Sequence, residues 1–251
     1  MITRRRLLRG IGIGAGGLVV GGCDGLNRSE EFRGILRRFE DANRGLQRTL
    51  GGRNALAREF GEGDVSPVFR SNGTMMPGTS EYQALAAGRF ADWRLSVDGL
   101  VQRPLSLSLA QVQQLPRRTQ ITRHDCVEGW SAVGKWTGAL LGPLLDAAGL
   151  KEEAQFIIFH CMDLYGDRPY YESIDLVDAF HPQTILAYGL NDQVLPVPNG
   201  APLRLRVERQ LGYKHAKYLH RIEARASLDG LYGGKGGYWE DVADYEWYAG
   251  I

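Results

Sequence analysis

A single cysteine at the end of an expected strand constrains this 251-residue chain more than any other feature. Cys126 lies in the run Arg-His-Asp-Cys-Val-Glu-Gly-Trp-Ser at residues 123–131, among charged and aromatic neighbours. A deprotonated thiol is a soft, electron-donating ligand, which suits a soft metal better than it suits a hydrophobic core. The sequence therefore predicts that Cys126 binds a metal.

The first 23 residues carry an export pattern. Thr3-Arg4-Arg5-Arg6-Leu7-Leu8-Arg9 matches the twin-arginine signal, and the apolar stretch at 11–22 is about half of the roughly 20 residues that a membrane span needs. Val20-Gly21-Gly22-Cys23 resembles a lipoprotein processing box in which Cys23 is acylated, and a plain cleavage site is the alternative. Both predict a periplasmic protein that meets the membrane only through its leader or through a lipid anchor at Cys23.

Charge and composition exclude some functions. Four of the 30 basic residues lie in the leader, so the mature chain has 26 basic and 29 acidic residues and a net charge near −3. This charge provides no electrostatic footprint for a nucleic acid. An apolar content of 43% and a charged content of 24% predict a globular protein with one sizeable core or two small ones.

The mature chain has two cysteines besides Cys23, and two interpretations of them stay open. Cys126 and Cys161 can form a disulfide, as thiols of exported proteins usually do. Alternatively, Cys126 is protected as a metal-bound thiolate, which the twin-arginine pathway favours because it carries folded proteins with their cofactors in place. The first interpretation allows an exported lipoprotein that acts as a binding module without turnover.

The hydrophobic patterns predict an α+β fold with mixed sheets and short helices. Apolar residues recur at three- and four-residue steps over 27–60, which indicates an amphipathic helix interrupted at Gly45, Gly51 and Gly52. A loop follows over 61–79, Ser106 or Ser108 caps a short helix before Pro116, and residues 142–149 form a helix closed by glycine. Strands are expected at 93–99, 156–159, 185–188, 203–207 and 217–227. The predicted boundaries are a helical arm and linker over 24–66 and a main domain over 67–251.

Four motifs in order carry a resemblance to a known family. They are Cys126-Val127-Glu128-Gly129-Trp130-Ser131 with Trp136-Thr137-Gly138, His181-Pro182, Asn199-Gly200-Ala201-Pro202-Leu203-Arg204-Leu205, and Gly212-Tyr213-Lys214 with Lys217. Together they resemble the molybdopterin-binding domain of the sulfite oxidase family, over roughly residues 69–227. The best match is the branch of periplasmic protein-methionine-sulfoxide reductase catalytic subunits, which share Cys-Val-Glu-x-Trp-Ser. The resemblance implies the sulfite-oxidase-type fold and a molybdenum-molybdopterin cofactor with Cys126 as the metal ligand.

The residues around Cys126 suggest catalytic roles. Arg123 is suited to lower the thiol pKa and to attract an oxyanion, and Glu128 is suited to carry a proton during oxygen-atom transfer. For both residues a surface or supporting salt bridge is an equally good interpretation.

The resemblance also implies the residues that hold the pterin and its phosphate. Arg204 suits a bidentate phosphate contact and Lys217 a point-charge contact, while Asn199 offers a donor and an acceptor to the pterin edge. The segment His215-Ala216-Lys217 matches a cofactor-binding position of the family, and Asn72 is assigned to the family's Asn-containing loop, although its spacing to Cys126 differs. Cys161 stands where the reductase branch has a cofactor-binding threonine, either as a weak donor or as a small apolar group.

The resemblance leaves the substrate open between a sulfoxide to be reduced and sulfite to be oxidised. No Cys-x-x-Cys-His run occurs, so a separate haem-containing or other electron-transfer partner is expected. The glycine-rich and aromatic segment at 233–248 is either a lid over the cofactor, shaped by Tyr238 and Trp239, or a tail packed on the domain. The length leaves no room for the dimerisation domain of eukaryotic sulfite oxidases, which predicts a monomeric catalytic unit.

Overall fold

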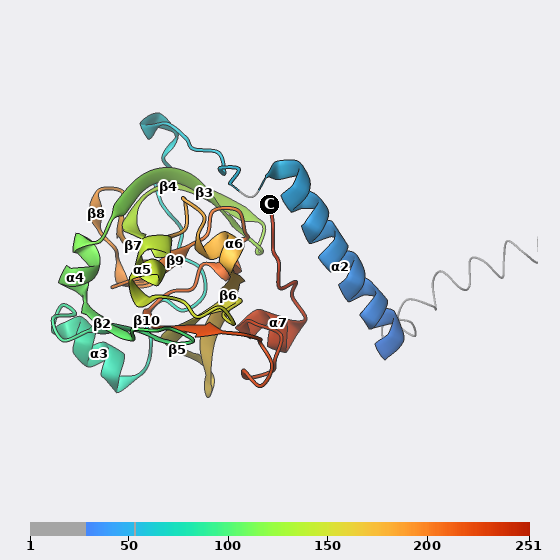
Figure 1. Ribbon diagram of the computed structural model, residues 1–251. Helices are drawn as coiled ribbons and strands as arrows, with labels where there is room; N and C mark the ends of the chain where they lie inside the picture. The colour runs from blue at the N-terminus through green and yellow to red at the C-terminus, as the bar shows by residue number, and fades with distance from the viewer. Residues whose placement is uncertain (1–28, 53) are drawn as a thin grey trace, which may run out of the picture. The chain divides into compact units, whose positions relative to one another are not determined.

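The computed structural model describes residues 29–52 and 54–251, and the chain divides into two units at Gly52. The first unit contains helix α2 (Glu30–Gly51), drawn in blue in Figure 1. Its N-cap is Ser29, whose hydroxyl accepts the Phe32 N–H at 3.4 Å. The helix runs through Gly45 without a break and stops at Gly52. The twin-arginine pattern and Cys23 lie outside the described residues. No helix in residues 29–52 or 54–251 has the length and apolar character to span a membrane.

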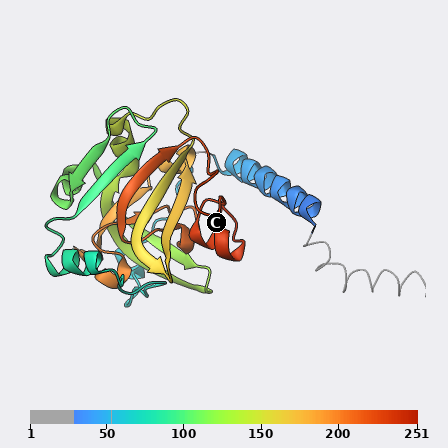
Figure 2. The same ribbon diagram turned by 90° about the horizontal axis from the view of Figure 1, so that it is seen from below.

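One mixed sheet of the second unit has the strand order β2-β1-β10-β5-β6. Strands β1 and β10 run parallel, and the other neighbouring strands run antiparallel. Figure 2 shows these strands side by side, from the green β1 to the yellow β5. The strands are β1 (Arg94–Gly99), β2 (Leu105–Ser108), β5 (Phe156–Tyr165), β6 (Arg168–Asp175) and β10 (Leu219–Arg225).

The second sheet is antiparallel and carries Cys126. Its order is β3-β4-β7-β8, and β9 also pairs with β7. Figure 1 shows β3 and β4 on the opposite side of this unit from β10 and β5. The strands are β3 (Arg117–Cys126), β4 (Trp130–Leu140), β7 (Ile185–Leu190), β8 (Gln193–Val194) and β9 (Arg204–Arg206).

Short helices connect the strands, and several end where the sequence predicts. Ser108 caps α4 (Leu109–Gln114) through a capping box with Gln111, and Gly149 closes α5 (Leu141–Ala148) in the left-handed conformation. The α+β class with mixed sheets and short helices is thereby confirmed. The other helical elements are η1 (Glu62–Asp64), α3 (Ser80–Ala87), α6 (Leu176–Ala179), η2 (Val197–Asn199), η3 (Gly212–Lys214) and α7 (Tyr238–Ala243).

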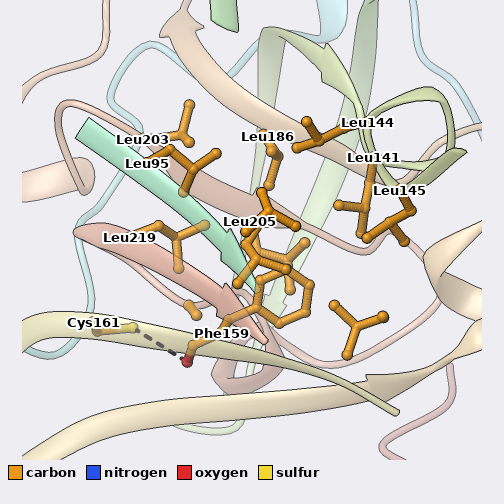
Figure 3. Close-up of a cluster of buried hydrophobic side chains, with 14 of the residues drawn as sticks. Leu95, Leu141, Leu144, Leu145, Phe159, Cys161, Leu186, Leu203, Leu205 and Leu219 are labelled. Atoms are coloured by element: carbon orange, nitrogen blue, oxygen red, sulfur yellow. Dashed lines mark hydrogen bonds between the residues drawn. The ribbon is translucent and has the colours of Figure 1, made fainter. Parts of the chain in front are cut away.

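The largest hydrophobic cluster joins both sheets to α5. Leu95, Phe159, Leu186 and Leu205 contribute one strand side chain each, and α5 adds its leucines (Figure 3). Burying a side chain of this size contributes roughly 1.5–3 kcal/mol, so this cluster supplies much of the folding free energy. Figure 3 also shows Cys161 within the cluster, near the backbone oxygen of Phe159.

Residues 54–66 lie along the second sheet. Glu59 forms a β-bridge with Thr122, the Phe60 N–H donates to the Ile121 oxygen at 2.9 Å, and the Ser66 N–H donates to the Val133 oxygen at 2.9 Å. The sequence pattern places these residues in a linker, whereas their backbone groups extend the hydrogen bonding of β3 and β4. Their contacts place them in the same unit as the sheets.

Candidate functional site

Cys126 is the last residue of β3, at the hairpin that leads into β4. Side chains alternate along a strand, so Gln120, Thr122, His124 and Cys126 all point into the unit and are buried. The turn closes with the Gly129 N–H on the Cys126 oxygen at 3.0 Å, and Gly129 has a φ of 87°. A side chain at Gly129 would be strained in this conformation, which explains the glycine in the motif.

Arg123 is not brought to the thiol. It lies on the outer face of β3, where its guanidinium Nε is 2.9 Å from Asp125. Arg70 is the arginine that affects Cys126, and its guanidinium lies 5.4 Å from the centre of the Trp130 ring. Burial raises the pKa of Cys126, and the Glu128 N–H and the Arg70 charge oppose this shift only in part. The metal-free thiol is therefore protonated at neutral pH, and binding a metal must displace its proton.

A partly enclosed cavity of about 150 Å³ opens beside Cys126. Its wall includes Glu128, whose carboxylate accepts the Trp130 indole N–H at 2.9 Å. Five aromatic rings form another part of the wall, and they come from β5, β6, η3, α7 and the segment after α7. The lining residues are Asn72, Gly73, Cys126, Val127, Glu128, Asp163, Tyr165, Tyr170, Gly212, Tyr213, His215, Lys217, Trp239 and Tyr245.

Two buried cations, Lys217 on the cavity wall and Arg204 behind it, have no carboxylate partner among the described residues. Arg204 is 1% exposed and donates to the backbone oxygens of Asn199 at 2.8 Å and His215 at 3.2 Å. Burial and the neighbouring Arg206 charge lower the pKa of Arg204 to about 9. Lys217 is 7% exposed, and burial and the Arg204 charge lower its pKa to about 7. Buried charges are costly unless an opposite charge compensates them, so this pair is suited to bind an anion such as a phosphate.

Several buried polar atoms around the cavity have no hydrogen-bond partner. His215 Nδ1 and Asp163 Oδ1 belong to residues of the cavity wall. The Asn199 side-chain nitrogen and Arg204 Nε belong to residues outside the wall, and Arg204 contacts it by donating to the His215 oxygen. Native proteins satisfy nearly all buried polar groups, so a cluster of unsatisfied donors and acceptors indicates a polar ligand. Donors, acceptors and two cations match a pterin with a phosphate tail, and Cys126 supplies the soft ligand that molybdenum requires. The site therefore fits the molybdopterin cofactor.

The other residues that the sequence predicts to bind the cofactor are positioned in different ways. The Asn72 oxygen accepts the Lys217 ammonium at 2.6 Å, so Asn72 and Lys217 line the cavity together. Ala216 does not line the cavity, and its backbone oxygen accepts the Leu205 N–H at 2.8 Å. Cys161 does not line the cavity, and burial raises the pKa of its thiol well above the usual value.

Cys126 and Cys161 are free thiols, so the disulfide interpretation is wrong. The two residues belong to different sheets, with Cys126 at the β3 hairpin and Cys161 in the hydrophobic cluster on β5. The non-catalytic module that depended on this disulfide loses its support.

The C-terminal segment is packed on the domain, and part of it, without Tyr238, also lines the cavity, while its action as a lid stays a prediction. Trp239 and Tyr245 line the cavity and stack with an interplanar angle of 25°. The segment is also packed on the domain, because the Tyr213 hydroxyl donates to the Glu246 oxygen at 2.6 Å and the Leu211 N–H donates to the Ala249 oxygen.

Sequence reasoning missed Asp163 and most of the aromatic wall, of which it proposed only Trp239 for a role at the site. Asp163 is 2% exposed, and burial raises its pKa to about 6. It lies on β5 two residues after Cys161, in a strand whose pattern extends beyond the predicted segment 156–159. A charged residue inside an otherwise apolar run was the available signal. The tyrosines and Trp239 come from distant segments, so no local pattern groups them.

Comparison with known proteins identifies close relatives. The oxidoreductase molybdopterin binding domain family matches residues 83–229. A protein of Azospira oryzae whose name assigns it to the protein-methionine-sulfoxide reductase subunits, YedZ1, is 36% identical over 236 residues, covering 94% of this chain and 83% of that protein. The protein-methionine-sulfoxide reductase catalytic subunit MsrP of Campylobacter jejuni is 34% identical over 144 residues, covering 53% of this chain and 48% of that protein.

A solved structure shares the fold. The sulfane dehydrogenase SoxCD of Paracoccus pantotrophus superposes with a TM-score of 0.50 at 22% identity, covering 55% of this chain and 39% of that chain. At this identity the likeness concerns the fold and leaves the substrate undetermined.

Proposed function

This chain belongs to the oxidoreductase molybdopterin binding domain family, and we propose that it reduces a sulfoxide by oxygen-atom transfer in the periplasm, with electrons from a separate redox partner. The cofactor of the family is molybdopterin, and the chain is an oxidoreductase of the sulfite oxidase type. Two relatives are named as protein-methionine-sulfoxide reductase subunits, which supports the choice of a sulfoxide.

The composition of the cavity wall is the observation that carries this proposal. The two carboxylates on the wall, Glu128 and Asp163, repel an anion such as sulfite. The one ammonium on the wall among the described residues, Lys217, is assigned to the phosphate of the cofactor, so it does not offset this repulsion. The aromatic rings offer favourable contacts to sulfur and to apolar substituents. A neutral sulfoxide therefore suits this cavity better than sulfite does.

The residues of the chain have separate tasks in this proposal. Cys126 would hold the molybdenum as a thiolate, while Arg204, Lys217 and Asn199 would hold the phosphate and pterin. The bound cofactor supplies the two-electron chemistry of oxygen-atom transfer. Reduction of a sulfoxide consumes two protons and two electrons and releases a sulfide and water, so the site needs a proton donor. Glu128 lines the cavity beside Cys126 and is placed to carry that proton.

An assay of the holoprotein tests the direction of the reaction. We expect a reduced viologen dye to be oxidised when dimethyl sulfoxide or a peptide containing methionine sulfoxide is added. Sulfite should reduce a cytochrome only slowly in the same preparation. The rate of dye oxidation, normalised to bound molybdenum, is the measurement. Fast sulfite oxidation with no sulfoxide-dependent dye oxidation would overturn the proposal.

The same assay examines the aromatic wall. Trp239→Ala should raise the KM for the peptide sulfoxide by about two- to tenfold, since a sulfur–aromatic contact contributes about 0.3–1.5 kcal/mol. Tyr232→Ala is the matched control, because Tyr232 is a 53% exposed aromatic residue that precedes α7 and lies outside the cavity wall. Equal KM values in the two variants would remove Trp239 from substrate binding.

Export by the twin-arginine pathway and a lipid anchor at Cys23 belong to the same proposal. Changing Arg4 and Arg5 to lysine should trap the precursor in the cytoplasm, because the pathway recognises the paired arginines. Cell fractionation followed by immunoblotting measures the distribution. Cys23→Ala is the companion variant, which should still be exported but should move from the membrane fraction to the soluble periplasmic fraction. Undiminished export of the double lysine variant would contradict the assignment of the leader.

A further inference from the structure

His124 is not part of the cavity wall but packs directly behind two wall residues, Gly212 and His215, and it takes no part in the functions assigned above. It precedes Cys126 by two residues on the buried face of β3 and is 1% exposed. Its ring centre lies 5.1 Å from that of His215, which lines the cavity. Its Nε2 faces Gly212, another wall residue, so closely that a Cβ there would lie 2.5 Å from this nitrogen. Only glycine at position 212 leaves room for the imidazole.

A buried ion pair fixes the tautomer of His124. The Nε–H group of Arg206 donates to the Glu208 carboxylate at 2.9 Å, and both side chains are fully buried. Nη1 of the same guanidinium lies 2.9 Å from His124 Nδ1. A guanidinium only donates, so Nδ1 must accept, and the single proton of the imidazole resides on Nε2.

The Nε2–H group of His124 has no hydrogen-bond partner among the described residues. A buried donor left without an acceptor is destabilising, so its presence calls for an explanation, and a bound ligand that accepts the hydrogen bond supplies one. Arg206 and Glu208 are themselves costly to bury, and Gln120 is also used to hold the Glu208 carboxylate at 2.8 Å. This arrangement holds the His124 Nε2–H donor in one orientation, two residues before Cys126, the proposed metal ligand.

We propose that the His124 Nε2–H group donates a hydrogen bond to the bound molybdopterin cofactor, on the side of the cavity nearest Cys126. The Arg206–Glu208 pair then acts through His124 as a positioning pair that keeps the donor tautomer. The inference rests on cofactor binding by the family and is independent of the substrate proposed above.

Two substitutions distinguish the roles of the two ring nitrogens of His124. His124→Asn retains an acceptor near the position of Nδ1 for Arg206 but removes the Nε2 donor. His124→Gln places an amide N–H near the position of Nε2. His220→Asn is the matched control, since His220 is a half-buried histidine on β10 that does not line the cavity.

The measurement is retention of the cofactor by each purified holoprotein, followed as molybdenum and pterin per chain during incubation. We expect His124→Asn to lose molybdenum about tenfold faster than the parent protein, as expected for one lost hydrogen bond. His124→Gln should lose molybdenum more slowly than His124→Asn, and His220→Asn should match the parent. Thermal unfolding of the cofactor-free proteins should give similar midpoints for all four.

Three results would overturn the proposal. His124→Asn retaining its molybdenum as long as the parent would show that the cofactor does not use this donor. Equal rates of loss from the asparagine and glutamine variants would show that the Nε2–H group is not the determinant. A markedly lower unfolding midpoint of the cofactor-free asparagine variant would assign His124 a structural role, for example through an N–H contact with the His215 ring.

Discussion

Replacing Cys126 with serine is expected to abolish turnover and to remove most of the bound molybdenum. The Cys126 thiol is the one sulfur on the cavity wall of the described unit, and a hydroxyl is a poor substitute as a soft ligand. Losing a residue that merely supports a metal ligand typically costs 10–100-fold in affinity or activity, so losing the ligand itself should cost more than about 100-fold. Molybdenum per chain and the rate of dye oxidation measure the two effects.

Cys161→Ala is the comparison for this variant. Cys161 lies in the hydrophobic cluster with its sulfur 4.0 Å from the Phe159 oxygen, and it does not line the cavity. We therefore expect this variant to retain its molybdenum, with a modest loss of stability. Loss of the cofactor from Cys161→Ala would support the cofactor contact that the family resemblance implies. Undiminished molybdenum and activity in Cys126→Ser would refute the ligand assignment.

Local patterns predicted the parts of the site that lie within one segment. Cys126 was expected at the end of a strand, and it is the last residue of β3. Asn199 and Arg204 lie on either side of a turn in one motif, and the structure keeps them together through the hydrogen bond from Arg204 to the Asn199 oxygen. Period-two alternation, applied to β3, would also have placed Arg123 on the face opposite Cys126. The prediction for Arg123 used proximity in sequence and did not apply this alternation.

Contacts between distant segments could not be predicted. Asp163, Tyr170 and Tyr245 line the cavity from β5, β6 and the segment after α7, and no motif links them. The contact between Arg206 and His124 could not be predicted either. Arg206 and Glu208 lie two residues apart, whereas His124 lies 82 residues away from Arg206. A single sequence contains no signal for such a pairing, since it arises only when β9 and β3 meet in the folded unit.

Replacing Lys214 with methionine should destabilise the protein by about 3–5 kcal/mol, because removing one member of a buried ion pair leaves an uncompensated charge. The Lys214 ammonium lies 2.7 Å from Glu172 and 2.5 Å from Glu240, and all three side chains are buried. Burial raises the pKa of Glu172 well above its usual range, and the Glu240 charge adds to this shift. Burial alone would lower the pKa of Lys214, but the two carboxylates raise it. Urea unfolding of the cofactor-free protein measures the loss.

The position of this cluster connects stability to the active site. Lys214 lies in η3 between Tyr213 and His215, which both line the cavity, and Glu240 follows Trp239 in α7. The Tyr170 hydroxyl, which also faces the cavity, donates to the Tyr213 oxygen at 2.7 Å. The cluster thus ties two parts of the cavity wall to β6. We expect the methionine variant that remains folded to show a higher KM for the sulfoxide as well.

Two further variants test whether the unpaired charge causes the loss of stability in Lys214→Met. Lys235→Met removes the lysine of an exposed pair with Asp244 and should cost no more than about 1 kcal/mol, as exposed ion pairs do. Combining Lys214→Met with Glu172→Gln and Glu240→Gln removes all three ionisable groups at similar volume. This triple variant should recover part of the lost stability, because it leaves no buried charge unpaired, while the two buried amides still need hydrogen-bond partners. Should the triple variant be no more stable than Lys214→Met alone, packing of the lysine chain rather than the unpaired carboxylates would account for the loss.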